Sequence, residues 1–92
     1  MTTTETDLQH RIRFLLHWGL VEIRNLAYGG GHDEQIAYLA DVLELLPGFL
    51  NDEKQPKFDV IREQFANYAK RFPESRYEYL AYLDGKAIPD HF

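Results

Sequence analysis

The most strongly patterned part of the chain is the stretch from residue 35 to residue 50, and its hydrophobic positions predict a helix. At about 100° per residue, the apolar side chains cover one face and spread around most of the circumference. The core-facing positions are Ile36, Leu39, Ala40, Leu43 and Leu46. The remaining polar strip consists of Glu34, Ala37, Asp41 and Glu44. We therefore predict a buried central helix that ends at Pro47-Gly48 and is covered by neighbouring helices or by a second chain.

Two apolar stripes run along a long first helix, which the pattern places from about residue 5 to residue 28. The main face comprises Leu8, Ile12, Leu15, Leu16, Gly19, Leu20, Ile23, Leu26 and Ala27. Glycine inside a helix is unfavourable by up to about 1 kcal/mol relative to alanine, so Gly19 indicates that another helix crosses closely there, the alternative being a glycine tolerated at a neutral surface position. The second stripe contains Phe14, Trp18, Val21 and Tyr28. It is either a second core face covered by the C-terminal segment or an exposed aromatic patch for a partner or a second copy.

Two further helices complete an all-α domain. An amphipathic third helix begins at Pro56, a favoured first position, and ends before Pro73, because the residue before a proline resists helix. A short, tyrosine-rich fourth helix ends at Asp84-Gly85, and Ser75 and Glu78 predict a capping box at its start. The sequence shows no strand pattern or repeat. We predict one domain over residues 1–92, a compact bundle of about four helices, with residues 1–5 and 86–92 as flexible or docked tails.

Composition and charge exclude several classes of function. The net charge of −5 argues against nonspecific binding to nucleic acid or to an anionic membrane. No run of 18 apolar residues and no basic signal-peptide start is present. The sequence contains no cysteine, which excludes disulfides and thiolate zinc sites and fits a cytoplasmic location.

The negative charge is concentrated on the predicted central helix and the loop after it. Residues 32–55 contain six acidic residues and one lysine, a local net charge of −5. Two apolar side chains of this helix, Tyr38 and Leu45, lie nearly opposite its core face. We therefore predict a partner-binding surface formed by Glu34, Tyr38, Asp41, Glu44 and Leu45.

No group of residues predicts catalysis, a metal or a cofactor. His10 and His17 lie two helical turns apart, about 10.5 Å, which is too far for one metal ion without further ligands between them. Asp41 and Glu44 share a face, but such a strip is usually solvated. Gly29-Gly30-Gly31 follows no strand and matches no phosphate-binding motif, so it predicts a helix C-cap and hinge. We predict no catalytic residue, no metal ligand and no cofactor.

Part of the sequence resembles a group of small helical bacterial proteins without an assigned activity. The resemblance rests on the segments Ile23-Arg24-Asn25-Leu26-Ala27, Gln35, Leu39-Ala40-Asp41, Leu46-Pro47 and Tyr79-Leu80-Ala81-Tyr82-Leu83. It covers about residues 20 to 84. The group carries His-Asn before Leu-Pro, where this chain has Glu44-Leu45. The resemblance implies a compact helical bacterial protein and no particular activity.

The combined features favour a non-enzymatic protein-binding module. A small acidic helical protein suits an inhibitor of the immunity-protein or antitoxin kind, which covers a basic site on its partner. The alternative is a homodimeric adaptor or regulator without catalytic activity, with Phe14, Trp18, Val21 and Tyr28 as the dimer interface. Nucleic acid and membranes are not expected partners.

Overall fold

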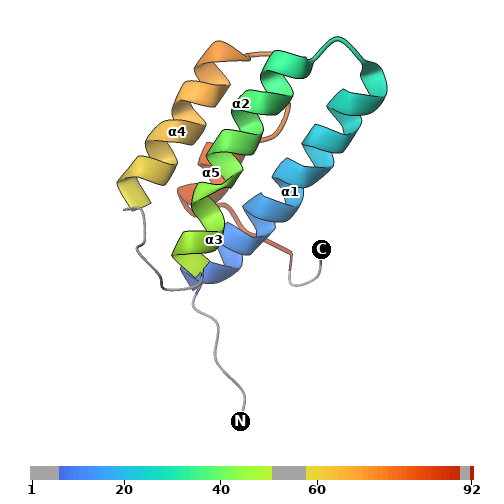
Figure 1. Ribbon diagram of the computed structural model, residues 1–92. Coiled ribbons are helices and arrows are strands. Elements are labelled where there is room, and N and C mark those ends of the chain that lie inside the picture. Colours follow the sequence, from blue (N-terminus) through green and yellow to red (C-terminus); the bar gives the residue numbers. More distant parts are fainter. Residues whose placement is uncertain (1–6, 51–57, 90–91) are drawn as a thin grey trace.

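The computed structural model describes residues 7–50, 58–89 and 92. The chain forms α1 (Asp7–Gly29), α2 (Asp33–Leu43), α3 (Leu45–Leu50), α4 (Phe58–Arg71) and α5 (Tyr79–Leu83). In Figure 1, α2 lies between α1 and α4, α3 continues α2, and α5 lies behind these helices. No strand occurs among the described residues. The prediction of an all-α bundle is therefore confirmed.

The central helix is interrupted one turn earlier than the sequence predicted. The prediction of an end at Pro47-Gly48 is wrong, because α2 ends at Leu43 and α3 runs through both residues. Pro47 has no N–H to donate to the carbonyl of Leu43, four residues earlier, and its ring crowds that carbonyl. The break therefore falls at Glu44. Pro47 itself lies in the first turn of α3, where the backbone N–H groups lack helical partners in any case.

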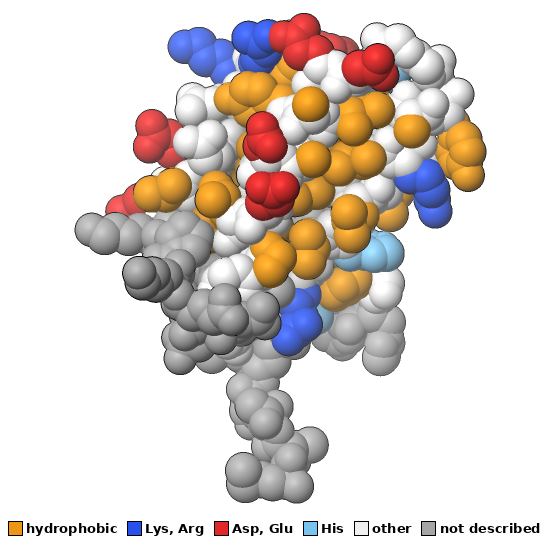
Figure 2. Space-filling view, viewed as in Figure 1, with side chains coloured by type: hydrophobic (Ala, Val, Ile, Leu, Met, Phe, Trp, Pro, Cys, Tyr) orange, Lys and Arg blue, Asp and Glu red, His pale blue; other side chains and the backbone are white. Residues whose placement is uncertain are grey.

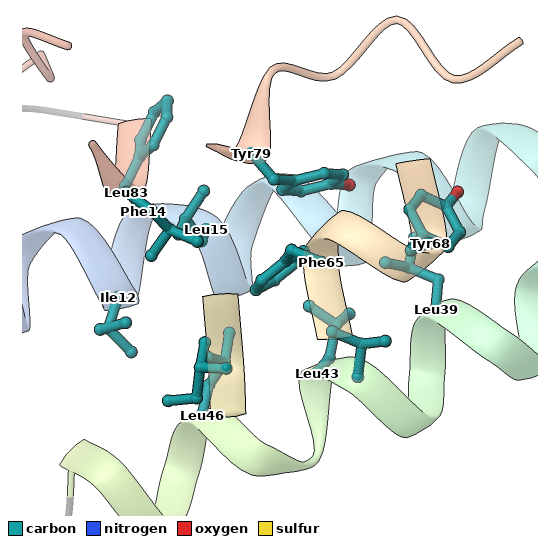
Figure 3. Close-up of a cluster of buried hydrophobic side chains, with 12 residues drawn as sticks. Ile12, Phe14, Leu15, Leu39, Leu43, Leu46, Phe65, Tyr68, Tyr79 and Leu83 are labelled. Atoms are coloured by element: carbon teal, nitrogen blue, oxygen red, sulfur yellow. The ribbon is translucent and has the colours of Figure 1, made fainter. Parts of the chain in front are cut away.

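One hydrophobic core joins all the helices. Figure 3 shows side chains from α1, α2, α3, α4 and α5 meeting in this cluster. The largest fully buried side chains are Ile12, Leu15, Leu39, Leu46, Ile61, Phe65 and Tyr68. Phe65 and Tyr79 stack with ring centroids 4.8 Å apart, which ties α5 to α4. Arg62 forms two hydrogen bonds with the carboxylate of Asp84, 2.9 and 2.8 Å long, at the end of α5.

The close helix crossing predicted at Gly19 is present. A β-carbon placed on Gly19 would lie 2.4 Å from Cδ2 of Leu43, nearer than two carbon atoms can approach. The glycine thus lets α1 and α2 pack against each other at this level. The two helices are antiparallel, because a short glycine turn joins them. Gly30 ends α1 with φ 72°, a conformation that glycine adopts without strain, and its N–H donates to the carbonyl of Leu26 at 3.2 Å.

The aromatic stripe of α1 is largely covered within the chain, and the main face is mostly buried or half-buried as predicted. Phe14 is buried, and Trp18 is half-buried with its ring centroid 4.8 Å from that of Tyr82 and 5.0 Å from that of Tyr77. The predicted interface of Phe14, Trp18, Val21 and Tyr28 is therefore not an exposed stripe. The C-terminal segment covers Phe14 and Trp18, Val21 is half-buried, and Tyr28 alone is fully accessible. Leu20, placed on the core face by its spacing, is instead 56% exposed.

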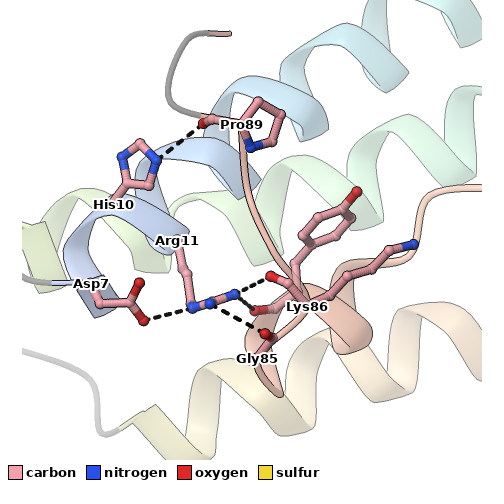
Figure 4. Close-up of polar contacts among 7 residues, drawn as sticks. Asp7, His10, Arg11, Gly85, Lys86 and Pro89 are labelled. Carbon is pink, nitrogen blue, oxygen red and sulfur yellow. Dashed lines mark hydrogen bonds and ion pairs between the residues drawn. The ribbon is translucent and has the colours of Figure 1, made fainter.

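The segment after α5 is docked on the start of α1. Figure 4 shows Arg11 directed at the carbonyls that end α5. Its guanidinium donates to the carbonyl oxygens of Tyr82 at 2.9 Å, Gly85 at 3.3 Å and Lys86. Its Nε also donates to Asp7 at 2.8 Å, within α1. The last carbonyls of a helix lack intrahelical partners, and Arg11 donates a hydrogen bond to one of them, the carbonyl of Tyr82. Of the two predicted tails, residues 86–89 are docked, and residues 1–5 lie outside the described residues.

Candidate functional site

A groove of about 340 Å³ runs between α2 and α4 on the face shown in Figure 2. Its lining is formed by Tyr38, Asp41, Val42, Leu45, Val60 and Gln64. Most of these side chains are apolar, and Val60 is 39% exposed on a helix whose other outward positions are mostly polar. A groove between two neighbouring helices is the place where a third helix packs.

Acidic side chains border this groove on both sides. Asp41 and Glu44 are exposed on α2, and Asp59 and Glu63 are exposed on α4. Glu63 follows Val60 by three residues, so it lies on the same side of α4, one turn on. Figure 2 shows red side chains on either side of the orange side chains between the two helices. Within the described part of the chain, Asp41, Glu44 and Glu63 form no ion pair, so their charge is available to a partner.

The end of the groove near the start of α2 is closed by contacts within the chain. Arg71, in the last turn of α4, forms an ion pair with Glu34 of α2. The guanidinium of Arg71 also lies over the ring of Tyr38, 6.0 Å from its centroid. The phenyl ring of Phe72 meets Tyr38 edge-on, with centroids 5.7 Å apart. These contacts fix the Tyr38 ring as part of the groove wall.

The structure brings together three of the five residues predicted to bind a partner. Tyr38, Asp41 and Leu45 line the groove. Glu44 lies on the outer ridge of α2 and lines the neighbouring depression between α1 and α2. Glu34 lies at the closed end, in its ion pair with Arg71.

Behind the groove lies a buried polar cluster centred on Glu22 of α1. Glu22 is 4% exposed, and its carboxylate accepts three hydroxyl hydrogen bonds. The donors are Tyr79 at 2.7 Å, Ser75 at 2.7 Å and Tyr68 at 3.0 Å. Gln35, 3% exposed on α2, in turn donates to the Tyr68 hydroxyl at 2.9 Å. The Glu22 cluster, defined as Glu22, Gln35, Tyr68, Ser75 and Tyr79, thus links α1, α2, α4, the connecting segment and α5.

The electrostatics of the Glu22 cluster keep its tyrosines in the donor form. Burial, followed by the neighbouring Glu22 charge, raises the pKa of Tyr68 to about 12. Burial and the hydrogen bond to Glu22 also raise the pKa of Tyr79 above its ordinary value. Neither phenol releases a proton near neutral pH, and neither lines the groove between α2 and α4. We interpret the cluster as a structural connection rather than a reactive site.

The sequence prediction for Ser75 was wrong. The helix begins at Tyr79, the residue before it is Glu78, and no side chain caps this end. Ser75 instead donates to Glu22, 53 positions earlier in the chain. Ser75 therefore serves the buried carboxylate of Glu22 rather than the start of α5.

Several contributors to these sites were missed from the sequence. Val60 and Gln64 of α4 were not identified, because a single exposed valine is common on a protein surface and gives no signal of a groove. Glu22 follows Leu15 by seven residues and Gly19 by three, so helical spacing places it on the core side of α1. A charged residue at such a position indicates a buried hydrogen-bond network.

Tests for other kinds of site give no candidate. Among the residues that the structure describes, no group of three or more His, Cys, Asp or Glu side chains could hold a metal ion. None of the described helices has the length and apolar character needed to cross a bilayer. Comparisons of the chain with protein-family models, curated proteins and solved structures give no match. The resemblance to small helical bacterial proteins therefore stays a prediction.

Proposed function

We propose that this protein is a non-enzymatic binding module that holds a basic amphipathic helix of another protein in the groove between α2 and α4. The observation that carries the proposal is the combination of an apolar groove with acidic side chains on both of its sides. An inhibitor of the immunity-protein or antitoxin kind, acting in the cytoplasm, would use such a surface to cover a basic site on its partner.

The chemistry of the groove defines the partner. Leu45 and Val60 provide apolar contacts for side chains spaced at i, i+3 or i+4 and i+7 on a docked helix, and Val42, 2% exposed, also lines the groove. Asp41 and Glu63 then face the flanks of that helix, where lysine or arginine would meet them. An apolar helix without basic flanks leaves these carboxylates unpaired, and a basic chain without apolar side chains leaves the groove empty. The partner therefore needs both features.

Electrostatic attraction predicts a specific kinetic signature. Association with a basic partner should slow as ionic strength rises, because salt screens the acidic side chains. Charge reversal at Asp41 should lower the association rate more than it raises the dissociation rate, since exposed rim charges act mainly on encounter. A partner that associates equally fast at low and high salt would remove these carboxylates from the mechanism.

The proposal can be tested by photo-cross-linking in cells of the source organism. A photoreactive amino acid at Gln64 places the probe in the groove, and the same amino acid at exposed Arg76 serves as the control. We expect Gln64 to capture a partner containing a basic amphipathic helix, and Arg76 not to capture it. The substitution Glu63→Lys should abolish the cross-link without changing the fold. Identical products from both positions, or capture that survives Glu63→Lys, would contradict the proposal.

A further inference from the structure

A second apolar surface lies on the same face of the molecule, between α1 and α2. A depression of about 250 Å³ separates the two helices here, and we call its apolar lining the α1–α2 band. The band consists of Leu16, Leu20, Ile23, Ala40, Leu43 and Pro47. Leu20 is 56% exposed at its centre. A neighbouring depression of about 310 Å³ shares Leu16 and Leu20 and extends the apolar surface toward Phe92. The band is thus continuous over several helical turns.

Basic and acidic side chains border opposite long sides of this band. On the α1 side, His17 and Arg24 are exposed. On the α2 side, Asp41 and Glu44 are exposed. Figure 2 shows blue and pale-blue side chains on one side of the central orange area and red side chains on the other. None of these four residues forms an ion pair within the described part of the chain.

The antiparallel register puts these charges at similar heights along the helices. Gly19 lies opposite Leu43, as the 2.4 Å approach of a β-carbon shows. Asp41 precedes Leu43 by two residues, so it lies level with position 21 of α1. Arg24 is three residues further along α1, a separation of about 4.5 Å along the helix axis at 1.5 Å per residue. Glu44 lies level with position 18, about 1.5 Å from the level of His17. Each acid on α2 therefore has a basic or imidazole side chain near its own height on α1.

From this arrangement we infer that the α1–α2 band is a self-complementary interface that binds a second copy of this chain. A two-fold axis that runs along the band, parallel to the helices, turns α1 of one copy onto α2 of the other. Arg24 then meets the second copy's Asp41, and His17 meets the second copy's Glu44. Both contacts occur twice, and the two apolar bands face each other between them.

The direction of the two-fold axis distinguishes this arrangement from the other symmetric packing of the same band. A two-fold axis perpendicular to the helices would place acids against acids and basic side chains against basic side chains. Like charges across an interface suppress that orientation. The charge pattern therefore selects one mode of packing out of the two that the apolar band alone would permit. The inference does not rest on the partner proposed for the groove between α2 and α4, although Asp41 borders both surfaces.

The first test measures the mass of the pure protein by sedimentation equilibrium over a range of concentrations. We expect a reversible monomer–dimer equilibrium. Leu20→Glu should give a folded monomer, because the side chain is already exposed in one copy. Val60→Glu, at an exposed apolar position outside the band, and Glu63→Lys, at the edge of the other groove, should both leave the dimer intact. A wild-type protein that stays monomeric at millimolar concentration, or a dimer that survives Leu20→Glu, would overturn the inference.

A charge-exchange experiment tests the symmetry itself. Arg24→Asp creates repulsion with Asp41 in its own homodimer, and Asp41→Arg creates repulsion with Arg24. Because the contact occurs twice, each variant alone should dimerise roughly tenfold to a hundredfold more weakly. An equal mixture of the two should dimerise again, since both Asp–Arg pairs are restored across the mixed interface. Circular dichroism of each variant establishes that the fold is kept. A mixture that stays as weak as the separate variants contradicts the pairing of Arg24 with Asp41.

Discussion

Removal of the Tyr79 hydroxyl should destabilise the fold far more than removal of a neighbouring tyrosine hydroxyl. In Tyr79→Phe the ring keeps its stacking on Phe65, but Glu22 loses a donor at 2.7 Å. The matched control is Tyr77→Phe. The Tyr77 ring also packs on Trp18, and its hydroxyl accepts a 3.2 Å hydrogen bond from Asn25 at the surface. The two substitutions remove the same atom from a buried and from an exposed hydrogen bond.

The expected magnitude follows from the burial of the acceptor. A hydrogen bond to a carboxylate contributes about 1.5–3 kcal/mol, and in a site that is 4% exposed no water replaces it readily. For a domain of this size, 1 kcal/mol corresponds to about 4–8 °C, so the melting temperature should fall by about 6–24 °C. Loss of the exposed hydroxyl of Tyr77 should change the free energy of unfolding by no more than about 0.5 kcal/mol.

Urea denaturation followed by Trp18 fluorescence provides the assay. Trp18 contacts Tyr77 and Tyr82, so its emission reports whether the C-terminal segment is docked. Circular dichroism of the helices should give a coincident transition if unfolding is two-state. In a Glu22→Gln background the effect of Tyr79→Phe should shrink, and the difference measures the coupling of the two side chains. Equal unfolding free energies for Tyr79→Phe and Tyr77→Phe would refute this account of the Glu22 cluster.

Three further predictions follow from the structure. Leu43→Ala should lower the free energy of unfolding by about 2–5 kcal/mol, because the side chain is buried against Gly19; an unchanged urea midpoint would show that the central helix is misplaced. Arg11→Lys should speed amide exchange in α5, because an ammonium cannot reach the carbonyls of Tyr82 and Gly85 as the guanidinium fork does; unchanged exchange there would contradict the capping role. In the folded chain the pKa of Tyr68 is raised to about 12. The unfolded chain therefore loses the phenol proton of Tyr68 at lower pH than the folded chain does, from about pH 10. Stability should therefore hold up to about pH 10 and fall toward pH 12, less steeply in Tyr68→Phe, whereas a flat profile in the wild type would exclude this effect.

The sequence predicted the order of the helices because the helical periodicity is strong in the central and third segments, but it did not predict that the central segment forms two helices, α2 and α3. It placed Ile12 and Leu15 of α1 on the core face correctly, but it left open the environment of the second stripe. That helix has apolar side chains on two stripes, and periodicity alone cannot decide whether the second stripe is also covered. The choice depends on the C-terminal segment, which covers Phe14 and Trp18 and leaves Leu20 exposed. Contacts with this distant segment determine which side chains of α1 are buried, and no local pattern in α1 predicts these contacts.

One wall of the candidate groove was predicted from the sequence, and the opposite wall was not, for a similar reason. Tyr38, Asp41 and Leu45 were identified from the predicted central helix alone, because they fall outside its core face; Leu45 lies in α3. The opposite wall required knowledge that α4, and not α1, lies next to these residues. The Glu22 cluster was missed entirely, since its donors are 46 to 57 positions away in the chain. Local patterns could mark Glu22 as unusual but could not identify Tyr68, Ser75 and Tyr79 as its partners.

The long sequence separations around Glu22 also determine when the fold can close during synthesis. α1 leaves the ribosome first, with Glu22 hydrated and the face around Phe14 uncovered. Glu22 gains its first donor when Tyr68 of α4 has emerged, but its hydrogen bonds and the cover over Phe14 are completed only by Tyr79 and Tyr82. Contacts between distant positions form late, since a long loop must be closed before they contribute. The nascent helices should therefore stay only loosely associated, and stable docking should come in one late step, when α5 packs on α1.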